Sequence, residues 1–240
     1  MTDAERALRA EIIRTCKQMA AAGINQGTSG NVSVRWEDGL LVTPSGLPYD
    51  TMAPEDIIFL AMDGTPTGPH NPSSEWRFHR DILKNRADIN AVVHAHPITL
   101  TGFAILGEDI PAVHYMIAAV GGPSIRCAPY ATFGTEELSQ NALAALEDRQ
   151  GCILANHGMI ACGPSLGKAL WLAIEMETLA QQYAVARSLG KPIVLSDAEI
   201  AHNVEKFKGY GPKRKDEAAP AAKAAPAKKP TRRRKPAAKA

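Results

Sequence analysis

Two histidines lie at the end of an apolar segment at residues 91–97 (AVVHAHP), where His94 and His96 stand two positions apart. Side chains at positions i and i+2 of a β-strand point to the same face, about 6 to 7 Å apart along the strand. Both imidazoles can therefore ligate one metal ion. Taken alone, such a pair is equally compatible with histidines that only make hydrogen bonds at a strand end.

A third histidine, His157, ends another apolar segment, CILANH at residues 152–157, and Gly158 follows it. We expect this glycine to let a ligand or a second chain approach closely. Three histidines at strand ends are typical of a site for zinc or a similar divalent metal with an open position for substrate. The third histidine makes the hydrogen-bonding interpretation of the pair much weaker.

Three segments rich in small hydrogen-bonding side chains could bind an anion: residues 28–31 (TSGN), 43–46 (TPSG) and 71–75 (NPSSE). Each of them taken singly is compatible with an ordinary turn. Together they predict an oxyanion site, because Ser73 and Ser74 stand at the expected start of a helix, whose free N–H groups and dipole favour a phosphate. Asn31, Ser45 and Gly46 could add neutral donors. The three segments contain no Lys or Arg, so dipoles and hydrogen bonds would hold the phosphate.

Glu75 directly follows these serines and is expected to lie between the phosphate and the metal. A carboxylate in that place could either ligate the metal or move a proton. The other four histidines lack a second ligand type at metal spacing, so we expect structural or surface positions for His70, His79, His114 and His202.

Helices and strands alternate along the chain. The apolar spacing and the capping residues predict helices over residues 3–22, 74–85 and 165–189, and others that begin at Pro97, Thr135 and Ser196. Short strands are predicted at NVSVRW, GLLVT, IIFLA, INAVVHAH, CILANH and MIACG, with turns at TPSGLPYD and MDGTPTG. This order predicts one α/β domain in three layers around a single sheet.

Composition places the chain among ordinary globular proteins. Its 240 residues are 45% hydrophobic and 22% charged, which rules out global disorder and a purely fibrous architecture. The four cysteines form no C-x-x-C pair, so we expect buried reduced thiols rather than disulfides. We find neither an apolar stretch long enough to span a membrane nor a signal-peptide apolar block, and we therefore expect a cytoplasmic protein.

Residues 212–240 differ from the rest in composition. Residues 213–240 hold 11 basic and 2 acidic residues, a net +9, whereas residues 1–212 hold 16 basic and 23 acidic residues, a net −7. The segment is rich in Lys, Ala, Pro and Arg and has no apolar residue that could supply a core, so we expect a disordered tail after a domain over residues 1–211. Nonspecific contact with nucleic acid is conceivable from the charge, but a solvated tail is the simpler interpretation.

Seven separated segments carry a resemblance to a known family: NPSSEWRFH, AVVHAHP, IPAVHYMIAA, CAPYATFGT, NHGMIACG, KALWLAIEMETLAQ and VEKFKGYG. In this order they resemble the class II sugar-phosphate aldolases, and the match spans nearly all of residues 3–211. The resemblance implies an α/β/α subunit with a mainly antiparallel sheet, a homotetramer with active sites at subunit interfaces, and no membrane association.

The resemblance also implies roles for individual residues. His94, His96 and His157 would bind zinc, and Glu75 would be the catalytic carboxylate that also touches zinc in the empty site. Tyr115 would be a catalytic tyrosine that reaches a neighbouring subunit's site. The remaining implied positions are Asn31, Ser45, Gly46, Ser73 and Ser74 around the phosphate, and Phe133 and Tyr210 at the aldehyde end.

The implied reaction is reversible cleavage of a ketose 1-phosphate to dihydroxyacetone phosphate and an aldehyde. L-fuculose 1-phosphate, 5-deoxyribulose 1-phosphate and 5-methylthioribulose 1-phosphate all remain open as substrates, because Asn156 replaces a histidine of the fuculose-specific pattern. A sugar-phosphate 4-epimerase or a methylthioribulose-1-phosphate dehydratase on the same scaffold is the alternative activity. A noncatalytic, adducin-like scaffold is the alternative class, but such relatives have lost metal ligands that this chain keeps.

Overall fold

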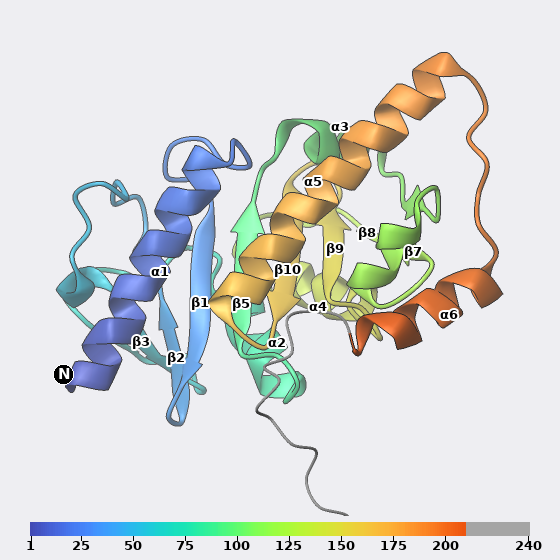
Figure 1. Ribbon diagram of the computed structural model, residues 1–240. Coiled ribbons are helices and arrows are strands. Elements are labelled where there is room, and N and C mark those ends of the chain that lie inside the picture. Colours follow the sequence, from blue (N-terminus) through green and yellow to red (C-terminus); the bar gives the residue numbers. More distant parts are fainter. Residues whose placement is uncertain (210–240) are drawn as a thin grey trace, which may run out of the picture. The chain divides into compact units, whose positions relative to one another are not determined.

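The computed structural model describes residues 1–209 (Figure 1). The helices are α1 (Asp3–Ala21), α2 (Trp76–Asn85), α3 (Ile98–Leu106), α4 (Glu136–Ala145), α5 (Leu166–Leu189) and α6 (Asp197–Phe207), with the 3₁₀ turns η1 (Pro54–Asp56) and η2 (Tyr115–Val120). The strands are β1 (Asn31–Trp36), β2 (Gly39–Val42), β3 (Ile58–Ala61), β4 (Pro66–Thr67), β5 (Ala91–Ala95), β6 (Ile110–Pro111), β7 (Ser124–Ile125), β8 (Cys127–Ala128), β9 (Gly151–Leu154) and β10 (Gly158–Gly163).

Eight strands form one sheet in the order β4, β3, β2, β1, β5, β10, β9, β8. Neighbouring strands run antiparallel except β8 and β9, which are parallel. β5 lies near the middle of the sheet, and its register places His94 opposite Asn31 of β1 on one side and Ile160 of β10 on the other. The mainly antiparallel α/β fold implied by the resemblance is thus confirmed.

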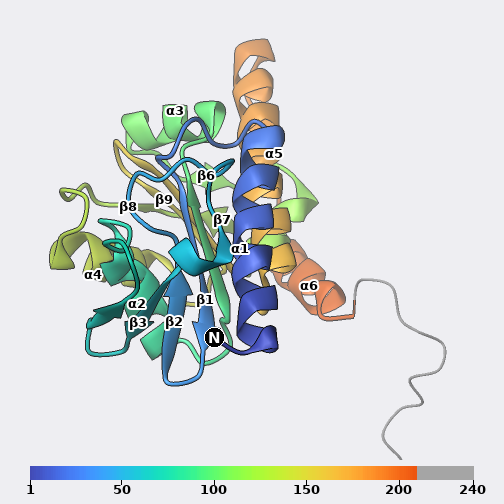
Figure 2. The ribbon, with the colours of Figure 1, turned by 90° about the vertical axis from the view of Figure 1, so that its left-hand side faces the viewer.

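Helices cover both faces of this sheet. α1 and α5 lie against one face and α2 and α4 against the other, as the view along the layers shows (Figure 2). Alternate residues of β5 enter the two cores: Val93 packs with α1 and α5, and Val92 with α2 and α4. Burial on both faces explains why this antiparallel strand reads as an unbroken apolar run instead of alternating with polar residues.

Local signals in the sequence fix most helix starts. The hydroxyl of Thr135 accepts a hydrogen bond from Leu138 N–H, and Ser196 and Ser165 cap α6 and α5 in the same way. Such a bond satisfies one of the N–H groups that a helix leaves free in its first turn. The predicted helix positions and the six predicted strands are confirmed to within one to three residues.

Two segments differ in detail from the predictions. The MDGTPTG segment turns at residues 62–64 as predicted, but it also contains β4, which pairs with β3 and is too short to show a period in sequence. The helix predicted from Ser74 begins at Trp76, because Ser73 and Glu75 form a turn in which Trp76 N–H bonds to Ser73 O. Tyr210 and the tail predicted at 212–240 lie outside the described residues. Every helix within residues 1–209 is too short or too polar to span a bilayer.

Candidate active site

Three histidines converge at one end of β5 and β10. His94 lies on β5, His96 directly after it, and His157 in the turn between β9 and β10. One ring nitrogen from each lies within 4.8 Å of the other two. The side-by-side placement predicted for His94 and His96 is confirmed, with ring centroids 4.6 Å apart. Three imidazoles this close can ligate a single divalent ion.

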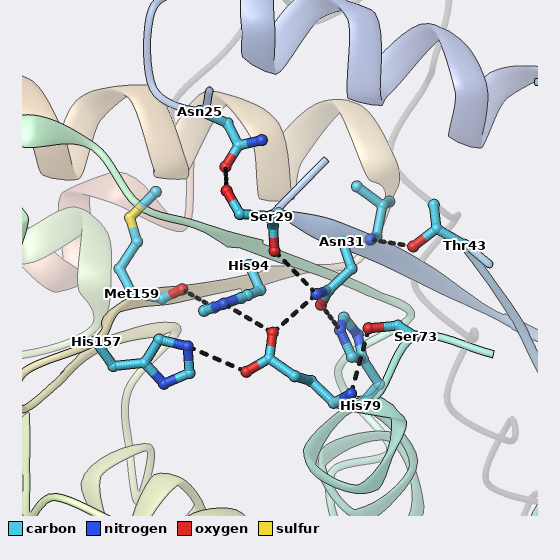
Figure 3. Close-up of polar contacts among 12 residues, drawn as sticks. Asn25, Ser29, Asn31, Thr43, Ser73, His79, His94, His157 and Met159 are labelled. Carbon is cyan, nitrogen blue, oxygen red and sulfur yellow. Dashed lines mark hydrogen bonds and ion pairs between the residues drawn. The ribbon is translucent and has the colours of Figure 1, made fainter. Parts of the chain in front are cut away.

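Glu75 reaches this cluster from the start of α2. Its Oε2 lies 3.1 Å from His94 Nε2, and its Oε1 lies 3.1 Å from His157 Nε2 (Figure 3). The carboxylate is 5% exposed and His94 is fully buried. Each of these contacts is an ion pair, and neither Glu75 Oε1 nor His94 Nε2 makes a hydrogen bond to any other group. Buried polar atoms without a partner are costly, and a divalent cation would satisfy both, so these residues fit a metal site.

Two of these groups have the protonation state that a metal ligand needs. Burial alone would lower the pKa of His94, but the Glu75 carboxylate raises it. Burial alone raises the pKa of Glu75, but the charges of His94 and His157 outweigh it and hold the pKa well below its usual range. Burial, reinforced by the other two histidines, lowers the pKa of His96 to about 3. Glu75 is therefore a carboxylate and His96 is a neutral imidazole near neutral pH, the forms in which both groups bind metals.

Backbone contacts orient the ligand side chains. His94 Nδ1 donates a hydrogen bond to Met159 O at 2.8 Å, which turns Nε2 toward the cluster. Gly158 leaves room for a neighbouring part of this chain. A Cβ at Gly158 would lie 2.5 Å from both Ala95 O and a His96 ring carbon, so the glycine permits a close approach to the end of β5 within this chain.

A buried carboxylate on α5 supports the chain just after His96. Glu177 accepts hydrogen bonds from Thr99 N–H at 3.1 Å and Leu100 N–H at 2.8 Å, both in the first turn of α3. These are donors that a helix start leaves unpaired. Glu177 therefore fixes α3 relative to α5. It lies in the segment KALWLAIEMETLAQ, but the sequence analysis gave it no role.

The three segments of small residues lie together beside the metal cluster. Ser73 N–H bonds to Thr43 O, and Ser45 N–H bonds to Asn71 O. These bonds tie residues 43–46 to residues 71–75, so the predicted grouping of these segments is confirmed. The N–H of Ser73 is not among the free groups of a helix start, because it bonds to Thr43 O and α2 begins at Trp76. The side chains of Ser45 and Ser74 remain exposed.

Asn31, the first residue of β1, contacts Glu75 as well as the small-residue segments. Its Nδ2 donates to Glu75 Oε2 at 2.9 Å, and its Oδ1 lies 2.5 Å from His79 Nε2. His79 was predicted to be structural and is fully buried, with its other ring nitrogen 2.7 Å from Ser33 Oγ. Sequence analysis gave no sign of Ser33, which alternates with the apolar residues of β1.

A pocket of about 330 Å³ opens next to these groups. Its lining residues come from five connecting segments and include the predicted Glu75, His96, His157, Ser74 and Phe133, together with Ser29, Tyr130, Ala131 and Asn156. The last four were not predicted to line it, although Ser29 lies in the TSGN segment and Tyr130 in CAPYATFGT. Phe133 and Tyr130 are largely exposed, so the pocket wall they form is open to solvent.

Tyr115 does not belong to this cluster. It begins η2, is 51% exposed, and is absent from the described pocket lining. Within residues 1–209, the structure therefore brings together the three histidines, Glu75, Phe133 and the small-residue segments, but not Tyr115.

A three-histidine and carboxylate cluster beside an open pocket on an α/β/α scaffold defines a protein built to hold a divalent metal. Residues 10–184 match the model of the class II aldolase and adducin N-terminal domain. The chain therefore belongs to the class II aldolase and adducin family.

Two curated relatives are similar in sequence. The L-fuculose phosphate aldolase of Escherichia coli (strain K12) is 53% identical over 205 residues, covering 85% of this chain and 95% of that protein. The 5-methylthioribulose-1-phosphate/5-deoxyribulose-1-phosphate aldolase of Rhodospirillum rubrum is 52% identical over 205 residues, covering 85% and 93%. Among solved structures, an L-fuculose 1-phosphate aldolase superposes with a TM-score of 0.82 at 38% identity, covering 84% of this chain and 96% of that one.

Proposed function

We propose that this protein is a cytoplasmic, zinc-dependent class II aldolase that reversibly cleaves a ketose 1-phosphate to dihydroxyacetone phosphate and an aldehyde. The observation that carries the proposal is a three-histidine cluster beside a pocket, in which the buried atoms Glu75 Oε1 and His94 Nε2 make ion-pair contacts at 3.1 Å but no hydrogen bond. The names of the aldolase relatives, all of which are covered almost completely, support the same activity.

His94, His96 and His157 would hold the metal, with Glu75 as a further contact in the resting site. A bound Zn²⁺ supplies Lewis-acid stabilisation of the negative charge that develops on substrate oxygens. In cleavage, the electron pair of the C3–C4 bond passes toward the C2 carbonyl oxygen, and the acid form of Glu75 would deliver its proton to C3 of the three-carbon product. The proton that leaves the C4 hydroxyl replaces it by exchange through solvent, so each cleavage moves one proton from the C4 hydroxyl to C3 with no net gain or loss. A neutral carboxylic acid and a carboxylate alternate at Glu75 during the cycle.

The phosphate would be held by Ser45, Gly46, Ser73 and Ser74, and by Asn31, whose second amide hydrogen makes only a long bond of 3.5 Å to Ser29 O. These donors are neutral, and the segments that carry them contain no Lys or Arg. Neutral donors would bind the phosphate through several hydrogen bonds at once. Such a site selects its ligand by the positions of the phosphate oxygens and does not attract it over long distances.

The aldehyde end would be completed by Phe133, by Tyr210, and by Tyr115 of a neighbouring subunit in a homotetramer. Tyr115 would take the proton of the C4 hydroxyl during cleavage. Its half-exposed position away from the described pocket is compatible with a role in another subunit's site. L-fuculose, 5-deoxyribulose and 5-methylthioribulose 1-phosphates are the candidate substrates, and relatives named for each kind are nearly equally similar.

Turnover of these three ketose 1-phosphates, followed by coupled detection of dihydroxyacetone phosphate, tests the proposal. We expect a chelator to abolish cleavage, Zn²⁺ to restore it, and borohydride treatment with substrate to leave the chain unmodified, because a Schiff base to lysine is not needed. Absence of dihydroxyacetone phosphate with an epimer or a dehydrated product in its place would overturn the aldolase assignment in favour of an epimerase or dehydratase.

A further inference from the structure

Behind Glu75 lies a row of buried polar side chains, which we call the Ser33–His79–Asn31 row. Ser33 Oγ lies 2.7 Å from His79 Nδ1, His79 Nε2 lies 2.5 Å from Asn31 Oδ1, and Asn31 Nδ2 lies 2.9 Å from Glu75 Oε2. Ser33 and His79 are fully buried and Asn31 is 5% exposed. Figure 3 shows the ring of His79 and the amide of Asn31 turned toward one another.

The direction of each hydrogen bond follows from its neighbour. A carboxylate only accepts hydrogen bonds, so the amide nitrogen of Asn31 must face Glu75 and its oxygen must face His79. His79 Nε2 therefore carries a hydrogen. Burial, and then the nearby His94, lowers the pKa of His79 to about 3, so the ring is neutral and its Nδ1 accepts from Ser33 Oγ. Every bond in the row points toward Glu75.

We propose that His79 and Ser33 are positioning residues that fix the amide of Asn31 and, through it, the catalytic carboxylate of Glu75. This inference rests on the proposed function, because it assigns Glu75 the proton transfer. The two oxygens of Glu75 contact different histidines, and the row holds Oε2, the one beside His94. If the amide turned over, two oxygens would face each other at Asn31 and Glu75, which is repulsive.

A histidine that serves only the core would contact side chains of the core. His79 does stack on Phe78, with ring centroids 4.7 Å apart, but both of its ring nitrogens make hydrogen bonds within the row that ends at Glu75. Outer residues that orient active-site groups in this way typically change activity by about 10- to 100-fold when removed.

Three variants separate positioning from simple packing. His79→Leu removes the donor to Asn31, whereas His79→Gln keeps an N–H near the position of Nε2 and should restore it. Ser33→Ala removes only the outer hydroxyl. Ser139→Ala is the matched control, because Ser139 is equally buried and its hydroxyl donates to Asp81 at 2.7 Å, between α2 and α4 and outside the site.

Activity is measured on zinc-loaded, full-length protein as kcat and KM, together with the exchange of the C3 proton of dihydroxyacetone phosphate with deuterium oxide. We expect His79→Leu to lower kcat and exchange about 10- to 100-fold with unchanged zinc content, and His79→Gln to recover most of the loss. Ser33→Ala should lower both by a smaller factor. Ser139→Ala should lower the melting temperature as much as Ser33→Ala and leave kcat unchanged.

A second readout does not depend on turnover. In zinc-loaded protein labelled with ¹⁵N-histidine, the His79 resonances should be those of a neutral ring protonated at Nε2, unchanged between pH 6 and 8. An Nδ1-protonated or charged ring would overturn the inference even if His79→Leu did not fold. Wild-type kcat and exchange in both His79→Leu and Ser33→Ala would also overturn it. A wild-type protein without aldolase activity, but with the expected His79 resonances, would instead count against the proposed function alone.

Discussion

The two halves of the candidate site differ in how completely one chain builds them. In the metal half, His94 is fully buried and Glu75 is 5% exposed, and each is fixed by neighbouring polar groups. In the aldehyde half, Tyr130 and Phe133 are 58% and 63% exposed and lie on a loop. A group that moves a proton must be held within a small fraction of an ångström, and buried strands and helix ends provide that.

We expect the specificity for the aldehyde portion of the substrate to depend on the open half. Its side chains lie on loops, which tolerate replacement without loss of the core. A family that varies the aldehyde while keeping the three-carbon phosphate would change this half and conserve the buried one. The similar identities to relatives named for different ketose 1-phosphates are consistent with that division.

The largest effect is expected in the metal half. His94→Ala removes a ligand, so bound zinc should fall well below one per subunit and turnover should fall by about 1,000-fold or more, because the metal is worth several kcal/mol of transition-state stabilisation. Elemental analysis and steady-state kinetics measure both. His202→Ala, an exposed histidine on α6, is the control and should keep zinc and activity. Full activity of His94→Ala would contradict the three-histidine site.

Replacing the carboxylate should separate chemistry from metal binding. Glu75→Gln keeps the shape and the contact with Asn31 but cannot take up a proton, so we expect kcat to fall about 100-fold or more while the three histidines still hold zinc. Zinc content and C3 proton exchange are the measurements. Unchanged exchange in the presence of zinc would show that another group moves the proton.

If the aldehyde half is completed by Tyr115 of a neighbouring subunit, two impaired variants should complement each other. Glu75→Gln and Tyr115→Phe are each expected to be impaired, but co-expressed together they should assemble some sites with an intact Glu75 and an intact Tyr115 from different chains. With random assembly, about a quarter of the wild-type turnover should return. Activity no higher than that of the two separate variants would place Tyr115 outside the neighbouring site.

A smaller effect is expected at the pocket wall. Phe133→Ala should change kcat/KM among the three ketose 1-phosphates by about tenfold or less, because it removes apolar contact with the aldehyde portion only. Competitive inhibition by inorganic phosphate should stay at its wild-type value, since Ser45, Ser73 and Ser74 are untouched. Weaker inhibition by phosphate together with an unchanged substrate preference would reverse this assignment.

The smallest effect is expected from removing residues 212–240, which follow the domain. A chain that ends at Gly211 should retain zinc content, oligomeric state and kcat within about twofold, because residues 212–240 have no aromatic or β-branched apolar residue to add to a core. A chain that ends at Lys206 also loses Tyr210 and should show altered aldehyde preference. Equal losses of kcat in the two truncated chains would show that the basic tail contributes to catalysis.

Much of the scaffold and the first metal ligands follow from local rules. The two-residue period of a strand is enough to bring His94 and His96 together, and a serine or threonine before an apolar helical pattern is enough to place the starts of α4, α5 and α6. These features depend on residues within a few positions of each other, so the sequence contains them without the fold.

Other parts depend on contacts between distant segments. Ser33 and His79 are 46 positions apart, and only the packing of α2 against β1 makes them partners of Asn31 and Glu75. The backbone N–H of Ser73 bonds to Thr43 O, a residue 30 positions earlier, and is not available to a phosphate. Gly158 has no room for a side chain, because the end of β5 lies beside it. The sequence by itself determined which residue types are available for metal and phosphate chemistry, because composition and spacing are local. Tertiary structure alone decided which of them hold Glu75 in place, because hydrogen bonds between remote segments form only when the sheet and its helices have packed.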